Sequence, residues 1–113
     1  MLQILHNPRC EKSRTCLAFA TEAKVEFEII NYLENPLTVT DLKVLLKKLG
    51  VKPIEIVRQK ETIWIENYKD KSLTDIDIIK ALAKHPILIE RPIIIDGDKA
   101  IIAREIDKLK TFI

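Results

Sequence analysis

The residues that could do chemistry gather near the start of the chain, in the stretch His6-Asn7-Pro8-Arg9-Cys10-Glu11-Lys12-Ser13-Arg14. Cys10 follows a short apolar run and precedes a segment with helical character, residues 15–24, which predicts that its thiol lies where a strand turns into a helix. Free N–H groups and the helix dipole stabilise an anion at such a point. The stretch also carries more cationic than acidic side chains. It therefore favours a nucleophilic thiolate at Cys10 over the alternative of an inert cysteine in a tight turn.

The residue types at fixed distances after Cys10 exclude two known kinds of cysteine site. A phosphatase-type loop needs an arginine six positions after the cysteine, where this chain has Cys16. A dithiol oxidoreductase needs a cysteine three positions on, where this chain has Ser13. We assign Cys16 to the core, because it would project about 240° around the helix from Cys10. The pattern predicts a site with one thiol, whose adducts an external thiol must discharge.

Three arginines outside this stretch are candidates for holding an anionic substrate: Arg58, Arg91 and Arg104. Each stands at the predicted boundary of an element, beside apolar residues, where its side chain could turn into a cleft. Guanidinium groups match tetrahedral oxyanions well. The equally open alternative is that they are surface or ion-paired arginines. No metal is expected, because the histidines and cysteines match no usual zinc spacing.

Composition sets broad limits. The chain has 113 residues, of which 47% are hydrophobic, so it should form one domain with a core of its own. The net charge of +2 is too small to argue for direct binding of nucleic acid. Two cysteines without a secretory signal favour a cytoplasmic protein with reduced thiols. No apolar run approaches the length of a membrane span.

Periodicity predicts a small α/β fold. Strands are expected at residues 3–5 and 25–29, joined by helix 15–24 in a parallel, right-handed unit. A strand pair is expected on either side of Asp96-Gly97-Asp98, and a final helix over residues 105–113. The order β-α-β, helices, β-β-α gives a mixed sheet covered by helices.

The middle of the chain, about residues 38–86, is predicted to be helical. Thr38 or Thr40 should cap a helix that ends at Gly50. Ser72 or Thr74 should cap another, which ends near His85. The inner face of this second helix is predicted from four apolar positions: Ile76, Ile79, Leu82 and Ala83.

Longer motifs resemble the glutaredoxin-coupled arsenate reductase (ArsC) family, which also includes Spx-type regulators and reductase-like proteins. The matching motifs are His6-Asn7-Pro8-x-Cys10-x-x-Ser13-Arg14, Tyr32-Leu33-Glu34-Asn35-Pro36, Arg58 and His85-Pro86-Ile87-Leu88-Ile89-Glu90-Arg91-Pro92-Ile93. The resemblance runs nearly end to end. It implies a thioredoxin-like fold with a four-stranded mixed sheet, as a single domain over residues 1–113 with a helical insert at about 38–86.

The resemblance also implies roles for individual residues. Cys10 would be the nucleophile, and Arg58, Arg91 and Arg104 would bind the oxyanion. A proline follows the third arginine in the arsenate reductases, where this chain has Glu105. The supporting residues would be His6, Asn7, Ser13, Arg14 and Pro92. Among them, Ser13 would donate a hydrogen bond to the thiolate, Arg14 would lower its pKa, and the Arg91–Pro92 peptide would be cis.

In such proteins the thiolate attacks arsenate, glutathione reduces the bound arsenic, and glutaredoxin clears the mixed disulfide. The expected reaction is therefore arsenate reduction with glutathione as co-substrate, glutaredoxin as partner and no bound cofactor. Two alternatives stay open. One is the glutathione-linked reduction of another substrate. The other is Spx-type regulation through binding to RNA polymerase, which Ser13 disfavours because that redox switch resembles a Cys-x-x-Cys pair.

Overall fold

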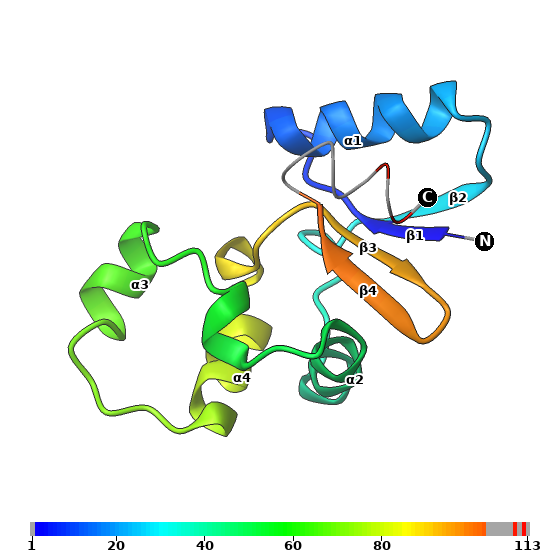
Figure 1. The fold of residues 1–113 in the computed structure, drawn as a ribbon. Coiled ribbons are helices and arrows are strands. Elements are labelled where there is room, and N and C mark those ends of the chain that lie inside the picture. Colours follow the sequence, from blue (N-terminus) through cyan, green and yellow to red (C-terminus); the bar gives the residue numbers. More distant parts are fainter. Residues whose placement is uncertain (1, 104–109, 111, 113) are drawn as a thin grey trace. The chain divides into compact units, whose positions relative to one another are not determined.

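The computed structural model describes residues 2–103, 110 and 112, and it divides the chain into two compact units (Figure 1). The first, called here the sheet unit, contains Met1–Glu34 and Arg91–Ile113. The second, the helical unit, contains Asn35–Glu90 and interrupts the sheet unit in the sequence. Cys10 and Arg91 therefore belong to one unit, although they lie far apart along the chain.

The sheet unit contains one mixed sheet of four strands in the order β2-β1-β3-β4. Its described elements are β1 (Leu2–Leu5), α1 (Glu11–Glu22), β2 (Phe27–Ile30), β3 (Ile93–Asp96) and β4 (Lys99–Ile102). Strand β1 pairs in parallel with β2 and antiparallel with β3, and β3 pairs antiparallel with β4. These pairings confirm the predicted parallel unit and strand pair. The final helix expected at 105–113 lies outside the described residues.

The core of the sheet unit forms because β1 and α1 each bury an apolar face. In β1 the side chains of Leu2, Ile4 and Leu5 are buried, as expected for a strand with a neighbour on both sides. Cys16 and Ala20 of α1 pack into the same cluster. Cys16 is thus a core residue, as predicted, and its burial raises the pKa of its thiol to about 11.

Helix α1 begins at Glu11, four residues before its predicted start. Cys10 is the N-cap residue, with extended backbone angles, and its carbonyl accepts the N–H of Arg14 at 3.0 Å. The first turn carries polar and charged side chains, so it adds nothing to the apolar periodicity that predicted the helix. The earlier start places Cys10 directly at the helix terminus.

The turn between β3 and β4 is shorter than predicted. Asp96 and Lys99 pair as the last residues of the ladder, which leaves a loop of Gly97 and Asp98. Gly97 has a φ of +60°, a conformation that two-residue turns require and that glycine adopts without strain.

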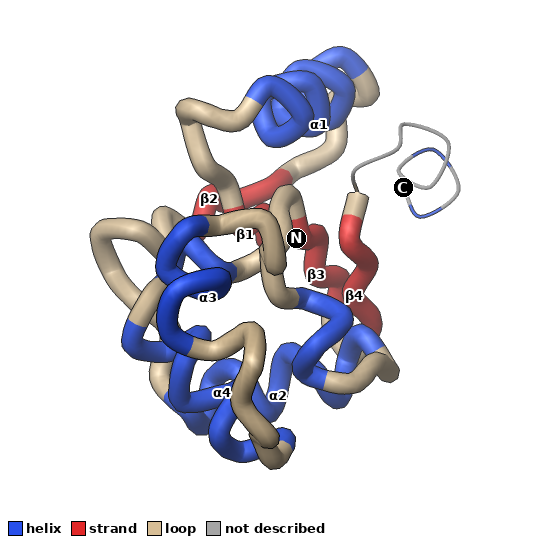
Figure 2. The backbone as a smooth tube through the Cα atoms, turned by 90° about the vertical axis from the view of Figure 1, so that its left-hand side faces the viewer, coloured by secondary structure: helices blue, strands red, loops and turns tan. Residues whose placement is uncertain are grey.

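The helical unit consists of short helices (Figure 2), and it buries aliphatic side chains such as Leu42, Leu45 and Leu82. Its elements are α2 (Val39–Leu49), η1 (Pro53–Ile56), α3 (Thr62–Asn67), α4 (Asp75–Lys84) and η2 (Pro86–Leu88). Of the predicted caps, the structure selects Thr38 and Thr74, each of which forms a capping box with the aspartate three residues later. Gly50, at φ +69°, ends α2 as predicted.

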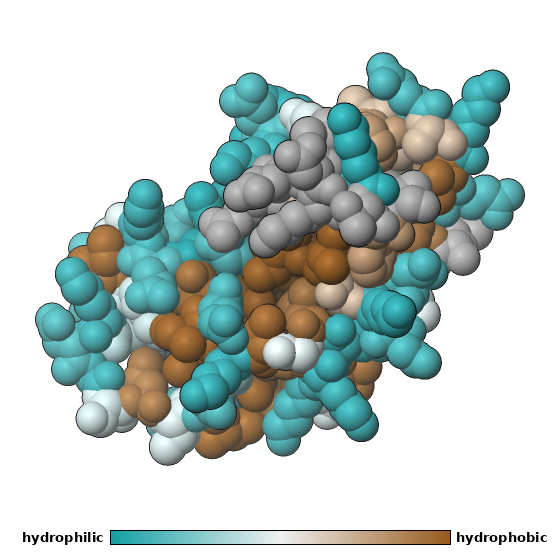
Figure 3. Space-filling model, viewed as in Figure 1, coloured by the Kyte–Doolittle hydropathy of each residue, from teal (hydrophilic) through white to brown (hydrophobic). Residues whose placement is uncertain are grey.

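The buried face of α4 differs from its predicted inner face. Ile79 and Leu82 are buried as predicted, but Ile76 is 37% exposed, and the other buried positions are Ile78 and Ala81. Ile76 lies in the first turn, and isoleucines at positions 76, 78 and 79 leave two helical registers open to a periodicity count. On the face that Figure 3 shows, hydrophobic patches lie between hydrophilic side chains. Among the described helices, none is both long and apolar enough to cross a bilayer.

Candidate active site

Cys10 lies in the loop between β1 and α1, and its backbone is fixed from both sides. Its N–H donates to the carbonyl of Asn7 at 3.0 Å, and its carbonyl accepts the first hydrogen bond of α1. The side chain is partly exposed. The thiol is therefore accessible while its position is set by the strand and the helix on either side.

The pKa of the Cys10 thiol is lowered below its usual value. Partial burial acts in the opposite direction, but three interactions outweigh it: the backbone N–H of Ser13, the guanidinium of Arg91 and the backbone N–H of Lys12. Both N–H groups belong to the first turn of α1, where helical N–H groups have no carbonyl partner. A thiolate at this point is thus stabilised by the helix and by the guanidinium of Arg91.

The source of this stabilisation matches the prediction in part. The free N–H groups at the helix start contribute as expected, but the cationic contribution comes from Arg91 rather than from the side chains of the stretch itself. The guanidinium of Arg14 donates instead to the carbonyl of Pro8, at 3.3 Å. Ser13 acts on the thiolate through its N–H rather than through its hydroxyl.

The hydroxyl of Ser13 organises the loop. It is fully buried, accepts the N–H of Asn7 at 3.0 Å and shares a hydrogen bond of 2.6 Å with Nδ1 of His6. The Oδ1 atom of Asn7 in turn accepts the N–H of Arg9 at 2.9 Å. Burial lowers the pKa of His6, so its ring is neutral near pH 7. Three supporting residues named from sequence, His6, Asn7 and Ser13, therefore form one buried network that fixes the loop.

Arg91 supplies the positive charge beside Cys10. The peptide between Arg91 and Pro92 is cis, as the resemblance implied. Two guanidinium nitrogens of Arg91, Nε and Nη1, are buried without a hydrogen-bond partner among the described residues. Buried donors on a charged group are costly unless an acceptor meets them. An oxyanion bound next to the thiolate would supply such acceptors.

Arg58 belongs to the helical unit, where the ends of two short helices anchor its backbone. Val57 and Ile89 form an isolated antiparallel bridge, and the N–H of Arg58 donates to the carbonyl of Leu88 at 2.7 Å. Its guanidinium pairs with the carboxylate of Glu61. Sequence reasoning missed this partner, although an arginine and a glutamate three residues apart are a recognisable signal. Arg104 lies outside the described residues.

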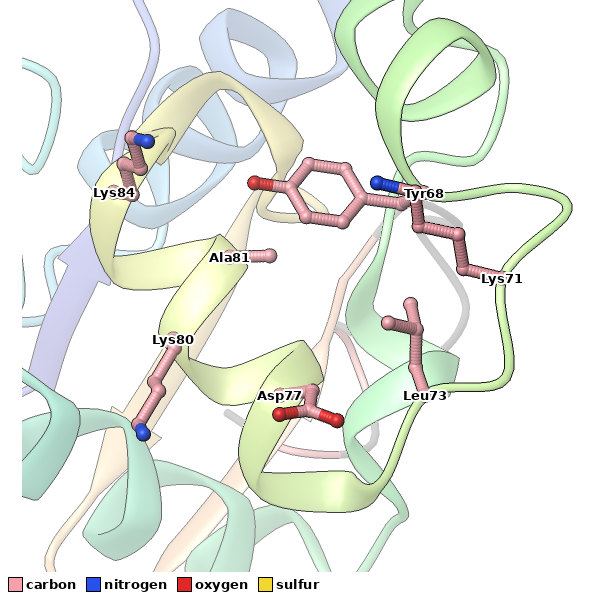
Figure 4. Close-up of a pocket in the computed structure, with 7 residues that line it drawn as sticks. All are labelled: Tyr68, Lys71, Leu73, Asp77, Lys80, Ala81 and Lys84. Atoms are coloured by element: carbon pink, nitrogen blue, oxygen red, sulfur yellow. The ribbon is translucent and has the colours of Figure 1, made fainter.

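The helical unit also contains a cavity of about 380 Å³ (Figure 4). It is lined by Tyr68, Lys71, Leu73, Asp77, Lys80, Ala81 and Lys84, none of which was a predicted site residue. Tyr68 stacks on Trp64, with ring centroids 5.3 Å apart. In the close-up, Lys80 and Lys84 extend from α4 away from Leu73, so their charges do not converge on one point.

Within the described part of the chain, no group of three or more histidine, cysteine or acidic side chains converges as metal ligands would. The site in the sheet unit thus consists of a thiol, the N–H groups at a helix start and a buried guanidinium.

A mixed four-stranded sheet with a thiol at the β1–α1 junction and a cis proline before β3 defines a thioredoxin-like α/β protein. The sequence model of the ArsC family matches residues 5–112, and the chain belongs to that family.

Relatives and solved structures agree with this assignment. YfgD of Escherichia coli K12, a protein without a characterised function, is 44% identical over 91% of this chain and 88% of its own. An arsenate reductase of Neisseria meningitidis is 34% identical over 96% of this chain and 95% of its own. The solved structure of an arsenate reductase from Vibrio cholerae superposes with a TM-score of 0.92 at 35% identity, covering 99% of this chain and 97% of that one.

Proposed function

We propose that this protein reduces arsenate, with Cys10 as its only reacting thiol and with glutathione and glutaredoxin as electron donors. One observation carries the proposal: a thiol with a lowered pKa lies beside a buried guanidinium that has two nitrogens without partners among the described residues. The arsenate reductases among its relatives support the choice of oxyanion.

The chemistry balances with one protein thiol and two external ones. The Cys10 thiolate forms a sulfur–arsenic bond with arsenate, and one arsenate oxygen leaves as water. A glutathione thiolate then attacks the Cys10 sulfur, and the electrons of the sulfur–arsenic bond pass to arsenic, which falls from the pentavalent to the trivalent state. The trivalent arsenic leaves as arsenite, and Cys10 is left in a mixed disulfide with glutathione. A glutaredoxin thiolate attacks the glutathione sulfur of this disulfide, takes over the glutathionyl group and releases the Cys10 thiol.

Different groups of the protein would assist different parts of this reaction. The N–H groups of Ser13 and Lys12, with Arg91, keep Cys10 ionised for the first attack. Arg91, Arg58 and Arg104 would bind the arsenate oxygens, since a guanidinium offers paired donors to a tetrahedral anion. The same groups would stabilise the charge that builds on those oxygens during attack.

The decisive experiment is an arsenate reduction assay in which the thiol donors are varied. With glutathione and glutaredoxin present, the wild type should form arsenite, and Cys10→Ser should form none. Cys16→Ala is the matched control, because it removes the second, buried thiol and should retain turnover. Activity in Cys10→Ser, or a wild type that is inactive with every donor, would overturn the proposal.

Arg91 allows a finer test of oxyanion binding. Arg91→Lys keeps the positive charge but loses the paired donors, so KM for arsenate should rise about tenfold or more. Arg91→Gln should lose further activity, because it also removes the charge that stabilises the Cys10 thiolate. Equal activity in the wild type and both variants would exclude Arg91 from the site.

A further inference from the structure

Arg58 already has an anionic partner from its own chain. The carboxylate of Glu61 forms an ion pair with Nη1 of Arg58. The two side chains are 31% and 29% exposed, so the pair is partly withdrawn from water and its charges are less screened than those of a fully exposed pair. One nitrogen of the guanidinium is therefore already paired with a carboxylate of the same chain.

The backbone holds the two residues in this arrangement. The N–H of Glu61 donates to the carbonyl of Arg58 at 3.1 Å, which closes a tight turn just before α3. Glu61 is the N-cap residue of α3, but its side chain makes no capping hydrogen bond to that helix. A carboxylate at such a position often serves the free N–H groups of its helix. Here it is directed to Arg58 instead.

We propose that Glu61 competes with the substrate oxyanion for Arg58 and thereby sets how tightly Arg58 binds it. This inference rests on the proposed role of Arg58 in binding that oxyanion. A carboxylate and a tetrahedral oxyanion offer the same oxygen acceptors to a guanidinium. An incoming anion must therefore displace Glu61 or bind beside its negative charge. The repulsion is larger for a dianion, such as arsenate or phosphate, than for a monoanion. Glu61 acts through Arg58 and takes no part in the chemical step.

The first test measures the binding of inorganic phosphate by titration calorimetry at fixed ionic strength. Phosphate has the shape and charge of arsenate but does not react with the thiol, so wild-type protein can be used. Glu61→Gln keeps the size of the side chain and removes its charge, and it should bind phosphate about three- to fivefold more tightly. Glu66→Gln, an equal change of charge at an exposed position of α3, is the matched control and should bind like the wild type.

Two further measurements separate competition from a purely structural effect. In an Arg58→Gln background, Glu61→Gln should no longer change phosphate binding, because the two residues act on the anion as a pair. In arsenate turnover, the effect of Glu61→Gln should fall on KM rather than on kcat. A general change in folding would alter kcat or act equally in both backgrounds.

The possible outcomes separate this inference from the proposed reductase function. If phosphate binds but Glu61→Gln binds it no more tightly, this inference fails and the proposed reductase function is untouched. If Glu61→Gln tightens phosphate binding in a protein that reduces no arsenate, the inference stands and the proposed function fails. If neither the wild type nor Glu61→Gln binds phosphate, the anion-binding role of Arg58 fails, and the inference fails with it.

Discussion

At the scale of single residues, backbone groups and one guanidinium together lower the pKa of Cys10. Its partners are N–H groups fixed in the first turn of α1, together with Arg91. Peptide N–H groups do not titrate within the pH range of an enzyme, and a guanidinium loses its positive charge only above about pH 12. The thiolate environment is therefore constant over the range in which Cys10 itself titrates.

The lowered pKa of Cys10 predicts its reactivity as a function of pH. Alkylation by iodoacetamide in the Cys16→Ala background should show a midpoint below that of an ordinary cysteine, about 8.5. In Arg91→Gln the midpoint should move upward, because one of the stabilising interactions is lost. The rate is followed by mass spectrometry of the modified protein. A midpoint at or above 8.5 in the parent protein would contradict the activated thiol.

His6 predicts a pH dependence of stability. Its folded pKa lies below the unfolded value of about 6.5, so the folded state favours the neutral ring. As the pH falls through 6.5, the unfolded chain takes up a proton that folded His6 does not, and the free energy of unfolding decreases. Urea unfolding at pH 7.5 and 5.5 should show this loss, and His6→Gln should show less of it. An equal loss in both proteins would exclude His6 as the cause.

At the scale of elements, the capping boxes and turns explain where helices begin and end. Thr74 accepts the N–H of Asp77, and the Asp77 carboxylate accepts the N–H of Thr74. The hydrogen bond from the Thr74 N–H to the carboxylate is the chief cause of the lowered pKa of Asp77. The same arrangement at Thr38 and Asp41 starts α2. Both helices thus begin at residues that satisfy their free N–H groups.

Removing the cap of α4 should therefore destabilise the protein. Thr74→Ala should lower the free energy of unfolding by about 1 kcal/mol, as measured by urea denaturation. Thr74→Ser keeps the hydroxyl acceptor and should lie close to the wild type. If the serine variant loses as much as the alanine variant, the hydrogen bond to Asp77 is not the source of the stabilisation.

Most of the helix ends that the sequence predicted correctly were predicted from local signals. Thr38, Gly50 and Thr74 were recognisable because a cap depends on residues only a few positions apart. The start of α1 was placed too late because its first turn lacks apolar residues. The contact of Cys10 with Arg91 was not available from local pattern at all, since nothing near either residue encodes a contact between β1 and the segment before β3. Residue type and position made Arg91 one of three candidate arginines, and the ArsC resemblance placed it opposite Cys10.

At the scale of the whole molecule, stability depends on two separate sets of buried side chains. Ile94 on β3 is fully buried with Leu2 and Ile4 of β1, which joins the two ends of the described sheet unit. Leu42 and Leu82 are fully buried within the helical unit. Each unit thus has a core that substitutions can test on its own.

Truncation at a buried and an exposed isoleucine should give very different results. Ile94→Ala should cost about 2–5 kcal/mol, because it leaves a cavity among fully buried neighbours. Ile76→Ala, at a position that is 37% exposed, should change stability by no more than about 0.5 kcal/mol. The free energies come from urea denaturation of both variants. A large loss at Ile76 would favour the helix face predicted from sequence over the one in the structure.

The position of β1 inside the sheet also affects how the protein is made. Its partner β3 follows the whole helical unit, and Gln3 pairs with Ile95. A ribosome must therefore translate all of the helices of the inserted unit before the first strand can meet its second neighbour. Until then the nascent chain carries an apolar strand with one open edge, which is the period in which a chaperone would be of most use to it.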